Sequence, residues 1–207
     1  MKPEIPELRE KLKRKLNKSR YEHSLSVSYT CICLAMRYEY PLDTAELAGL
    51  MHDCAKCYDD EDIIKRCEKH KIPVSKEESM APAVLHAKYG AWLAKEHYGI
   101  KEPEILSAIA CHTTGKPGMG TLDKILYIAD YIEARRDKAA NLPQMRKLAF
   151  EDLDEALYQI LKGTLDYLDQ RGCFADPMTR ETFEYYEKER RCNGSVVRNG
   201  KIGESSS

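Results

Sequence analysis

Four of the six histidines occur where an imidazole could bind a metal ion. His23, His86 and His112 are spaced at three to eight residues from apolar neighbours, which predicts that each lies on the buried face of a helix. His52 ends an apolar run and is followed directly by Asp53. A single histidine on such a face is usually a core residue with one hydrogen bond, so each position taken alone has an ordinary structural explanation.

Two aspartates strengthen the metal interpretation. Asp53 follows an apolar run, and Asp130 lies in the middle of the apolar segment 122–132. Burying an isolated carboxylate costs several kcal/mol unless it is paired or bound to a metal. Imidazole nitrogens and carboxylate oxygens that converge from several helices form a site for a divalent transition metal, such as iron, manganese, cobalt, nickel or zinc. We therefore expect these six side chains to converge in the core.

The dipeptide His52-Asp53 sets a geometric condition on this site. Adjacent residues of a helix point about 100° apart, so both side chains can reach one ion only near a helix end or through convergent rotamers. The polar segment after Lys56 is consistent with a helix that ends there. Cys54 and Cys57 form a C-x-x-C pair, but no second pair has matching spacing, so core packing is a better explanation for Cys54 than a zinc or redox site.

The elements that would position these residues are all predicted to be helices. Valine occurs only five times, and apolar residues repeat every three to four positions, never in sustained alternation, which indicates an all-α fold. Gly115, Pro117, Gly118 and Gly120 indicate a loop over 113–120. The expected helices are 4–16, 19–40 (capped by Ser19), 43–56, 60–70, 83–97, 103–112, 122–136, 143–169 and 176–191.

Length and composition limit the class of protein. The 207 residues suit a single domain, predicted over 1–190, with a disordered tail over 191–207. A net charge of −1 argues against a nucleic-acid polymer as partner. No apolar run is long enough for a membrane span, and the charged N-terminus does not resemble a secretory signal. We therefore expect a cytoplasmic protein, in which the eight cysteines would be reduced.

Four segments carry a resemblance to a known family. The ordered set His23, His52-Asp53 and Asp130, with Lys56 three residues after Asp53, resembles the HD-domain metal-dependent phosphohydrolases. The match narrows to the symmetrical bis(5′-nucleosyl)-tetraphosphatases through Arg20-Tyr-Glu-His, Leu50-Met-His-Asp-Cys-Ala-Lys, Ala110-Cys-His-Thr-Thr-Gly and the segment 123–136. The resemblance covers roughly residues 8–176.

The resemblance implies an HD-domain helical bundle with a metal in its core and an enzyme that cuts diadenosine tetraphosphate into two ADP with a metal-activated water. It implies iron bound by His23, His52, Asp53 and Asp130, with a second metal at His86 and His112, bridged by Asp53, as an alternative to a single ion. Asp53 and Lys56 would be catalytic. The implied nucleotide contacts are Arg20, His23, Asp53, Lys56, His86, His112, Thr113, Asp130 and Arg136.

Several alternatives stay open at the level of sequence. The HD core alone does not separate this activity from hydrolysis of a nucleoside monophosphate, a dNTP, a cyclic nucleotide or a guanosine alarmone, although the His-Thr-Thr-Gly and Asp-Tyr-Ile-Glu segments favour the tetraphosphatase. A metal-binding or nucleotide-sensing module that is not an enzyme is a second alternative. Arg135 precedes Arg136, so either guanidinium could take the phosphate. Apolar positions of the helix predicted over 143–169 could form a homodimer interface or pack in the core.

Overall fold

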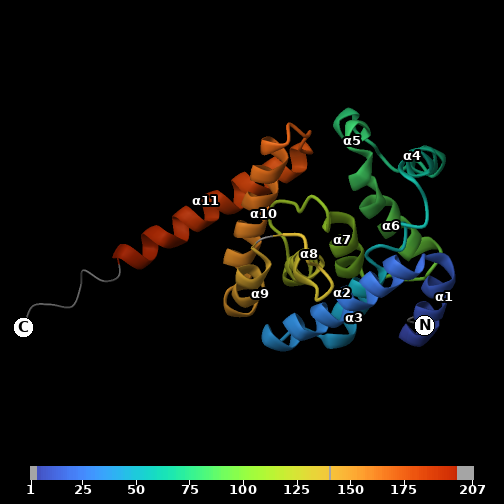
Figure 1. Ribbon diagram of the computed structural model, residues 1–207, viewed down its shortest axis with the longest axis horizontal. Coiled ribbons are helices and arrows are strands. Elements are labelled where there is room, and N and C mark those ends of the chain that lie inside the picture. Colours follow the sequence, from blue (N-terminus) through green and yellow to red (C-terminus); the bar gives the residue numbers. More distant parts are fainter. Residues whose placement is uncertain (1–3, 140, 200–207) are drawn as a thin grey trace, which may run out of the picture.

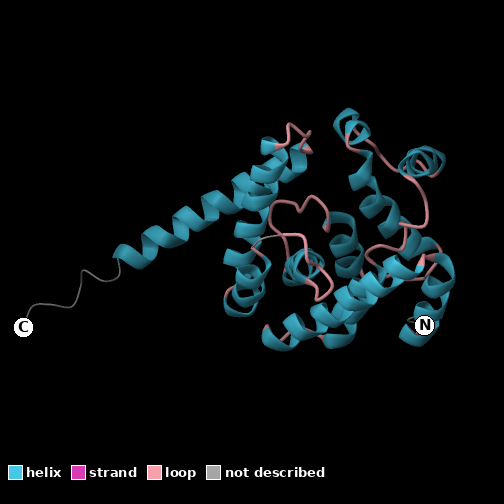
Figure 2. Ribbon diagram, in the orientation of Figure 1, coloured by secondary structure: helices cyan, strands magenta, loops and turns pink. Residues whose placement is uncertain are grey.

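The computed structural model describes residues 4–139 and 141–199, and every regular element in these ranges is a helix (Figures 1 and 2). The all-α prediction is confirmed. The elements are α1 (Ile5–Lys15), α2 (Lys18–Arg37), α3 (Leu42–Met51), α4 (Asp60–Lys69), α5 (Lys76–Met80), the 3₁₀ helix η1 (Pro82–Val84), α6 (Leu85–Glu96), α7 (Pro103–Cys111), α8 (Thr121–Ile132), α9 (Leu142–Glu151), α10 (Leu153–Gln170) and α11 (Pro177–Asn199).

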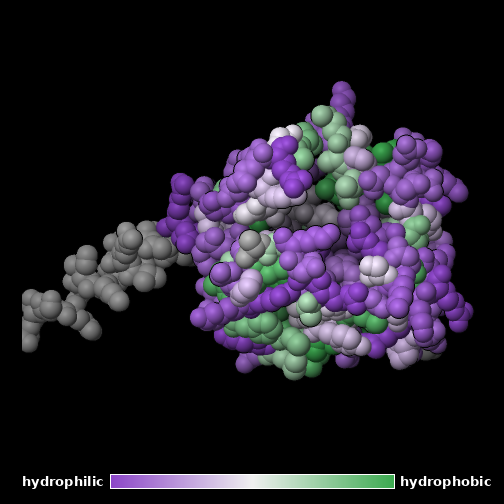
Figure 3. Space-filling model, viewed as in Figure 1, coloured by the Kyte–Doolittle hydropathy of each residue, from purple (hydrophilic) through white to green (hydrophobic). Residues whose placement is uncertain are grey.

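Helices α2, α3, α7 and α8 form the middle of the molecule, and His23, His52, His112 and Asp130 lie on these helices or directly after them. The helix α2 packs against α3 and α8, and α7 packs against α3, α6 and α8. Helices α4 to α6 flank this group on one side, and α9 to α11 flank it on the other, with α11 extending away from the body (Figure 1). The face shown in Figure 3 is mainly hydrophilic, as expected for a bundle that buries its apolar stripes.

A glycine allows α2 and α3 to approach closely. A Cβ atom built on Gly49 of α3 would lie 2.7 Å from the Cα atom of Ser28 on α2 and 3.0 Å from the Cys31 sulfur. Contacts below 3.0 Å are not tolerated by a real side chain, so only glycine permits this approach. The close packing brings His23 of α2 towards His52, which follows α3.

Several helix boundaries differ from the predicted ones because local polar contacts decide them. Helix α2 is capped by Asn17, whose side chain accepts the Arg20 N–H, and not by Ser19. The predicted helix over 143–169 is two helices, α9 and α10, because Asp152 has an extended backbone and caps α10 by accepting from the N–H groups of Asp154 and Glu155. The short α5 was not predicted; a capping box between Ser75 and Glu78 starts it.

Helix ends also differ near the site and at the C-terminus. Helix α3 ends at Met51 and α8 at Ile132, both earlier than predicted. Helix α11 continues to Asn199, eight residues beyond its predicted end and into the segment predicted to be disordered. Ion pairing between Arg191 and Glu187, one turn apart, supports the helix at this point. The remainder of the predicted tail, 200–207, lies outside the described residues.

Candidate metal centre

The end of α3 brings His52 and Asp53 to the same side. His52 is the C-cap of α3, and tight turns follow, in which the N–H of Cys54 donates to the Met51 carbonyl (3.0 Å) and the N–H of Lys56 to the Asp53 carbonyl (2.9 Å). The sequence prediction required a helix end or convergent rotamers here, and the structure has the helix end. Both side chains are buried.

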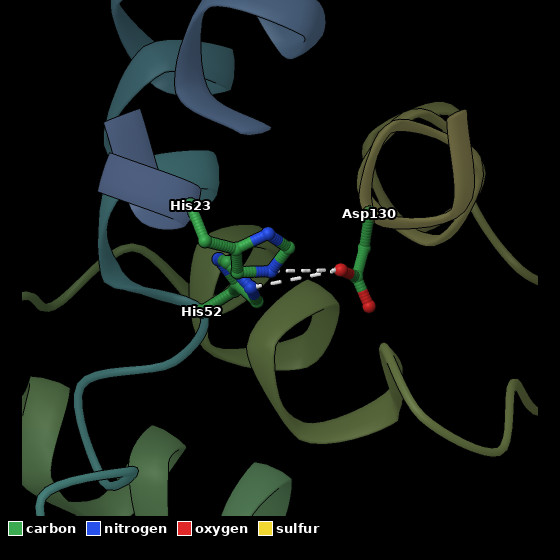
Figure 4. Close-up of side chains that lie close together, drawn as sticks. All are labelled: His23, His52 and Asp130. Carbon is green, nitrogen blue, oxygen red and sulfur yellow. Dashed lines mark ion pairs between the residues drawn. The ribbon is translucent and has the colours of Figure 1, made fainter. Parts of the chain in front are cut away.

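Three side chains from distant segments meet around one point. Asp130 Oδ1 lies 3.1 Å from His23 Nε2 and 3.9 Å from His52 Nε2 (Figure 4). Asp53 Oδ2 is also near both rings, at 3.9 Å and 3.6 Å respectively. The Nε2 atom of His52 is fully buried and has no hydrogen-bond partner among the described residues. A buried polar atom without a partner is costly, and a metal ion at this point would supply the missing partner.

A second set of ligands faces the other oxygen of Asp53. Asp53 Oδ1 lies 3.2 Å from His86 Nε2 and 3.8 Å from His112 Nε2. The two imidazole nitrogens are 3.1 Å apart. The carboxylate of Asp53 thus has one oxygen towards His23 and His52 and the other towards His86 and His112, which is the arrangement expected of a bridging ligand.

The opposite nitrogen of each ring is held by an acceptor. The Nδ1 atoms of His52, His86 and His112 each lie 2.6–2.8 Å from the backbone carbonyl three residues earlier, at Gly49, Ala83 and Ile109. An imidazole that donates from Nδ1 has a lone pair on Nε2, which is the form that binds a metal. His23 differs, because its Nδ1 lies 3.2 Å from the carboxylate of Glu133.

The electrostatics of the centre favour the metal-binding form of Asp53, Asp130, His52 and His112. Burial lowers the pKa of His52, and burial together with His86 lowers the pKa of His112. Burial alone would raise the pKa values of Asp53 and Asp130, but the facing imidazoles outweigh it and hold both below the usual range. Both carboxylates are therefore ionised, and two of the rings favour their neutral form, as metal binding requires. His23 differs: burial lowers its pKa, but hydrogen bonds and charges of Asp130, Asp53 and Glu133 outweigh burial and raise it.

Cationic side chains border the two carboxylates. Arg20 lies 3.2 Å from Asp53 Oδ2, and Arg136 lies 3.0 Å from Asp130 Oδ1. Both guanidinium side chains are almost half exposed, at 45% and 48%. Arg135 instead pairs with Glu22 at 2.8 Å, so Arg136 is the arginine beside the centre. Lys56 is half-buried. Its pKa is lowered overall, because the effect of burial exceeds the opposing effect of the Asp53 charge.

Thr113 borders a cavity of about 210 Å³ next to the centre. Its hydroxyl donates a hydrogen bond to the Val84 carbonyl, with an oxygen–oxygen distance of 3.5 Å. The residues around the cavity are His112, Thr113, Tyr127, Asp130, Tyr131, Arg136, Ile160 and Thr164. The cavity therefore connects the candidate ligands with two tyrosines and with α10.

Comparison with known proteins identifies the family. The sequence pattern of the HD domain matches residues 20–135, more than half of the chain. The chain belongs to the HD domain family. Every residue of the candidate centre from His23 to Asp130 lies within the matched range.

The HD-domain chain has similar relatives over most of its length. It is 36% identical to "Bis(5′-nucleosyl)-tetraphosphatase, symmetrical" of Bacillus subtilis (strain 168), covering 84% of this chain and 91% of the relative. It is 35% identical to the protein of the same name from Staphylococcus aureus (strain NCTC 8325 / PS 47), covering 84% and 90%. A crystal structure of a predicted HD superfamily hydrolase involved in NAD metabolism from Clostridium acetobutylicum superposes with a TM-score of 0.87 at 36% identity, covering 90% of this chain and 98% of that one.

The other histidines and the cysteines of this HD-domain chain take no part in the centre. His70 stacks on Trp92 with ring centroids 3.9 Å apart, and His97 lies edge-on to the same ring at 5.4 Å. The Cys54 thiol is buried and donates to the Gly90 carbonyl. An HD domain implies a divalent metal, and this centre contains imidazole and carboxylate groups that could bind one.

Sequence reasoning missed residues that surround the centre. Glu133 occurs in the segment that carried the resemblance, but its buried contact with His23 is not visible from spacing. Tyr127 lies on α8 three residues before Asp130, a spacing that could have indicated it as a neighbour, whereas Tyr131 directly follows Asp130 and has no such spacing. Thr164 is contributed by α10, and no sequence signal connects it with the site. None of the described helices is long and apolar enough to cross a membrane.

Proposed function

We propose that this chain is a metal-dependent hydrolase that cleaves dinucleoside tetraphosphates symmetrically, converting diadenosine tetraphosphate into two ADP. The observation that carries this proposal is the buried Nε2 of His52, which lacks a partner and faces the ionised carboxylates of Asp53 and Asp130. The names of the Bacillus and Staphylococcus relatives support the substrate. The cleavage consumes one water and leaves two phosphates on each product.

The proposed metal ligands are His23, His52, Asp53 and Asp130. Asp53 Oδ1 faces His86 and His112, which supports a second ion with Asp53 as the bridge. A bound divalent ion in such a site supplies a Lewis acid for a phosphoryl oxygen and lowers the pKa of a bound water. Asp53 accepts a hydrogen bond from the attacking water and orients it in line with the phosphoanhydride.

The cations beside the centre bind the phosphates of the substrate. Arg20 and Arg136 each have a partly exposed guanidinium next to a carboxylate, so they can turn towards phosphate oxygens without a large rearrangement. Guanidinium groups bind phosphate through two parallel hydrogen bonds. Lys56 neutralises the charge that develops on the leaving phosphate, and Thr113 offers a hydroxyl from the edge of the cavity beside Asp130.

We further propose that the metal is iron and that the protein works in the cytoplasm on a small-molecule nucleotide, without a nucleic-acid or membrane partner. Mixed imidazole and carboxylate ligands suit iron. The same ligands also bind manganese, cobalt, nickel and zinc, so metal analysis after anaerobic purification tests the metal. The homodimer stays a prediction, and light scattering tests it.

Product analysis tests the reaction. Diadenosine tetraphosphate is incubated with the metal-loaded protein, and the nucleotides are separated by chromatography. ADP as the single product is expected, whereas ATP together with AMP would overturn symmetrical cleavage. Release of phosphate from other nucleotides at a higher kcat/KM would favour a different HD phosphohydrolase. Nucleotide binding without metal-dependent turnover would favour a sensing module.

Variants of the carboxylates test the site. Asp53→Ala and Asp130→Ala are each expected to lose at least a hundredfold in kcat/KM, because each removes a ligand and a charge that faces the imidazoles. Asp166→Ala is the matched control, since Asp166 is on the exposed face of α10 and pairs with Lys162 at 2.6 Å. Near-wild-type hydrolysis by Asp53→Ala at saturating metal would overturn the proposed mechanism.

A further inference from the structure

His23 is positioned differently from the other three imidazoles of the centre. The Nδ1 atoms of His52, His86 and His112 face a backbone carbonyl of their own helix segment. The Nδ1 of His23 faces a side chain 110 residues away, the carboxylate of Glu133, at 3.2 Å. The orientation of this ring therefore depends on a tertiary contact and not on local helix geometry.

The two nitrogens of His23 lie between two carboxylates. Nε2 is 3.1 Å from Asp130 Oδ1, and Nδ1 is 3.2 Å from Glu133 Oε1. A neutral imidazole has a single N–H, so only one of the carboxylates can accept it. If Asp130 accepts the proton, Nε2 carries hydrogen and cannot bind a metal. If Glu133 accepts it, Nε2 has a free lone pair and points into the centre.

Glu133 is held firmly enough to compete for this proton. Its side chain is only 3% exposed, and it accepts a second hydrogen bond from the Arg135 N–H at 2.7 Å. The two carboxylate oxygens thus have separate contacts, Oε2 with the Arg135 N–H and Oε1 with Nδ1 of His23. A buried carboxylate in such contacts is a stronger hydrogen-bond acceptor than a backbone carbonyl.

The turn that carries Glu133 is fixed from α9. The guanidinium of Arg146 donates to the carbonyls of Ile132 (2.9 Å), Glu133 (2.9 Å) and Arg136 (2.8 Å). These carbonyls belong to the end of α8 and the turn after it, where no intrahelical donor is available. The same turn places Arg136 against Asp130. Arg146 thus holds the turn that positions both Glu133, next to His23, and Arg136, next to Asp130.

We propose that Glu133 is a positioning residue whose carboxylate accepts the Nδ1–H of His23 and thereby presents the unprotonated Nε2 to the metal centre. This inference rests on the metal centre of the proposed function but not on its substrate. Carboxylates that accept the second N–H of a metal-binding histidine fix its tautomer, and their removal typically weakens metal affinity by about 10- to 100-fold.

The tautomer of His23 in the metal-free protein provides the first test. Long-range ¹H–¹⁵N spectra of ¹⁵N-histidine-labelled protein, recorded at a pH where the ring is neutral, distinguish Nδ1–H from Nε2–H. The wild-type protein is expected to show His23 with hydrogen on Nδ1, and Glu133→Ala to show it on Nε2, donating to Asp130. A wild-type His23 that carries hydrogen on Nε2 would overturn the proposal without any variant.

Metal affinity provides the second test. Binding of cobalt(II), measured by competition with a chelator, is expected to weaken about 10- to 100-fold in Glu133→Ala and less in Glu133→Gln, whose amide oxygen still accepts from Nδ1. Glu22→Gln is the matched control, because Glu22 pairs with Arg135 on the partly exposed side of the same region, and its affinity is expected to equal that of the wild type. Circular dichroism checks that each variant is folded.

The outcomes separate this inference from the proposed function. A folded Glu133→Ala with wild-type cobalt affinity and an unchanged His23 tautomer would overturn the positioning role. If Glu133→Ala does not fold, Glu133→Gln and the wild-type tautomer decide instead. A protein with the expected tautomer and cobalt affinity that does not cleave diadenosine tetraphosphate would refute the proposed function and leave the role of Glu133 intact.

Discussion

Replacing Gly49 by alanine tests how closely α2 and α3 must pack. Alanine is normally favoured over glycine inside a helix by about 1 kcal/mol. At Gly49, however, the new Cβ would lie 2.7 Å from the Ser28 Cα and 3.0 Å from the Ser28 nitrogen. Both are backbone atoms, so no side-chain rotation relieves the contact. The two helices would have to separate by about 0.7 Å to reach an ordinary contact of 3.4 Å.

The size of the effect follows from these opposing contributions. Overpacking of a core typically costs about 1–3 kcal/mol, and a backbone contact of this kind belongs at the upper end. Subtracting the helix preference of alanine leaves a net destabilisation of about 2 kcal/mol. The separation also moves His23 on α2 away from His52, whose Nδ1 is held by the Gly49 carbonyl itself. Cobalt affinity should therefore fall together with the free energy of unfolding.

Urea unfolding of the metal-free protein measures the stability change, and Gly163→Ala is the control. Gly163 lies in the interior of α10, and among the described residues a Cβ there would meet the Asn141 side chain, at 3.9 Å. This substitution is expected to stabilise the protein by about 1 kcal/mol. A Gly49→Ala protein as stable as Gly163→Ala, with wild-type cobalt affinity, would refute the inference that this close approach sets the geometry of the centre.

Three further perturbations have defined expected outcomes. Gly115→Ala should destabilise the protein more than Gly118→Ala in thermal unfolding. Both glycines have a positive φ, but the Cβ added at Gly115 would also lie 2.7 Å from the Thr182 side chain. Arg146→Met should lower the free energy of unfolding by about 1–3 kcal/mol in urea, since it removes the guanidinium donor from the carbonyls of Ile132 and Arg136 and one of two donors from that of Glu133. Iodoacetamide at pH 8 should modify exposed thiols and spare buried ones, as mass spectrometry would show. Raising the pH should accelerate the reaction at Cys57 in particular, because burial raises the pKa of this thiol and only the thiolate reacts. The exposed thiols expected to react include Cys33, Cys57 and Cys173, and the buried ones are Cys31, Cys54, Cys67 and Cys111.

The fold class and most of the helices could be predicted because they depend on periodicity. Helix α4 and α7, for example, agree with their predicted bounds to within one residue. The break at Asp152 could not be predicted, because the apolar pattern continues on both sides and a single side chain caps the next helix. The choice of Arg136 over Arg135 depends on a turn after α8 that is fixed by Arg146, a contact between distant segments.

The candidate ligands could be predicted from the sequence more readily than the residues that position them. A carboxylate or imidazole within an apolar pattern indicates a site, because burying it unpaired is costly. The acceptors behind His52, His86 and His112 are backbone carbonyls, which every residue possesses, so they leave no trace in residue types. The acceptor behind His23 is a side chain, but Glu133 lies at a helix end next to exposed Ala134 and Arg135, where a glutamate is ordinary. Its burial comes from the turn that Arg146 holds. A sequence can therefore reveal which atoms would bind a metal, while the proton positions that make them able to bind depend on the folded chain.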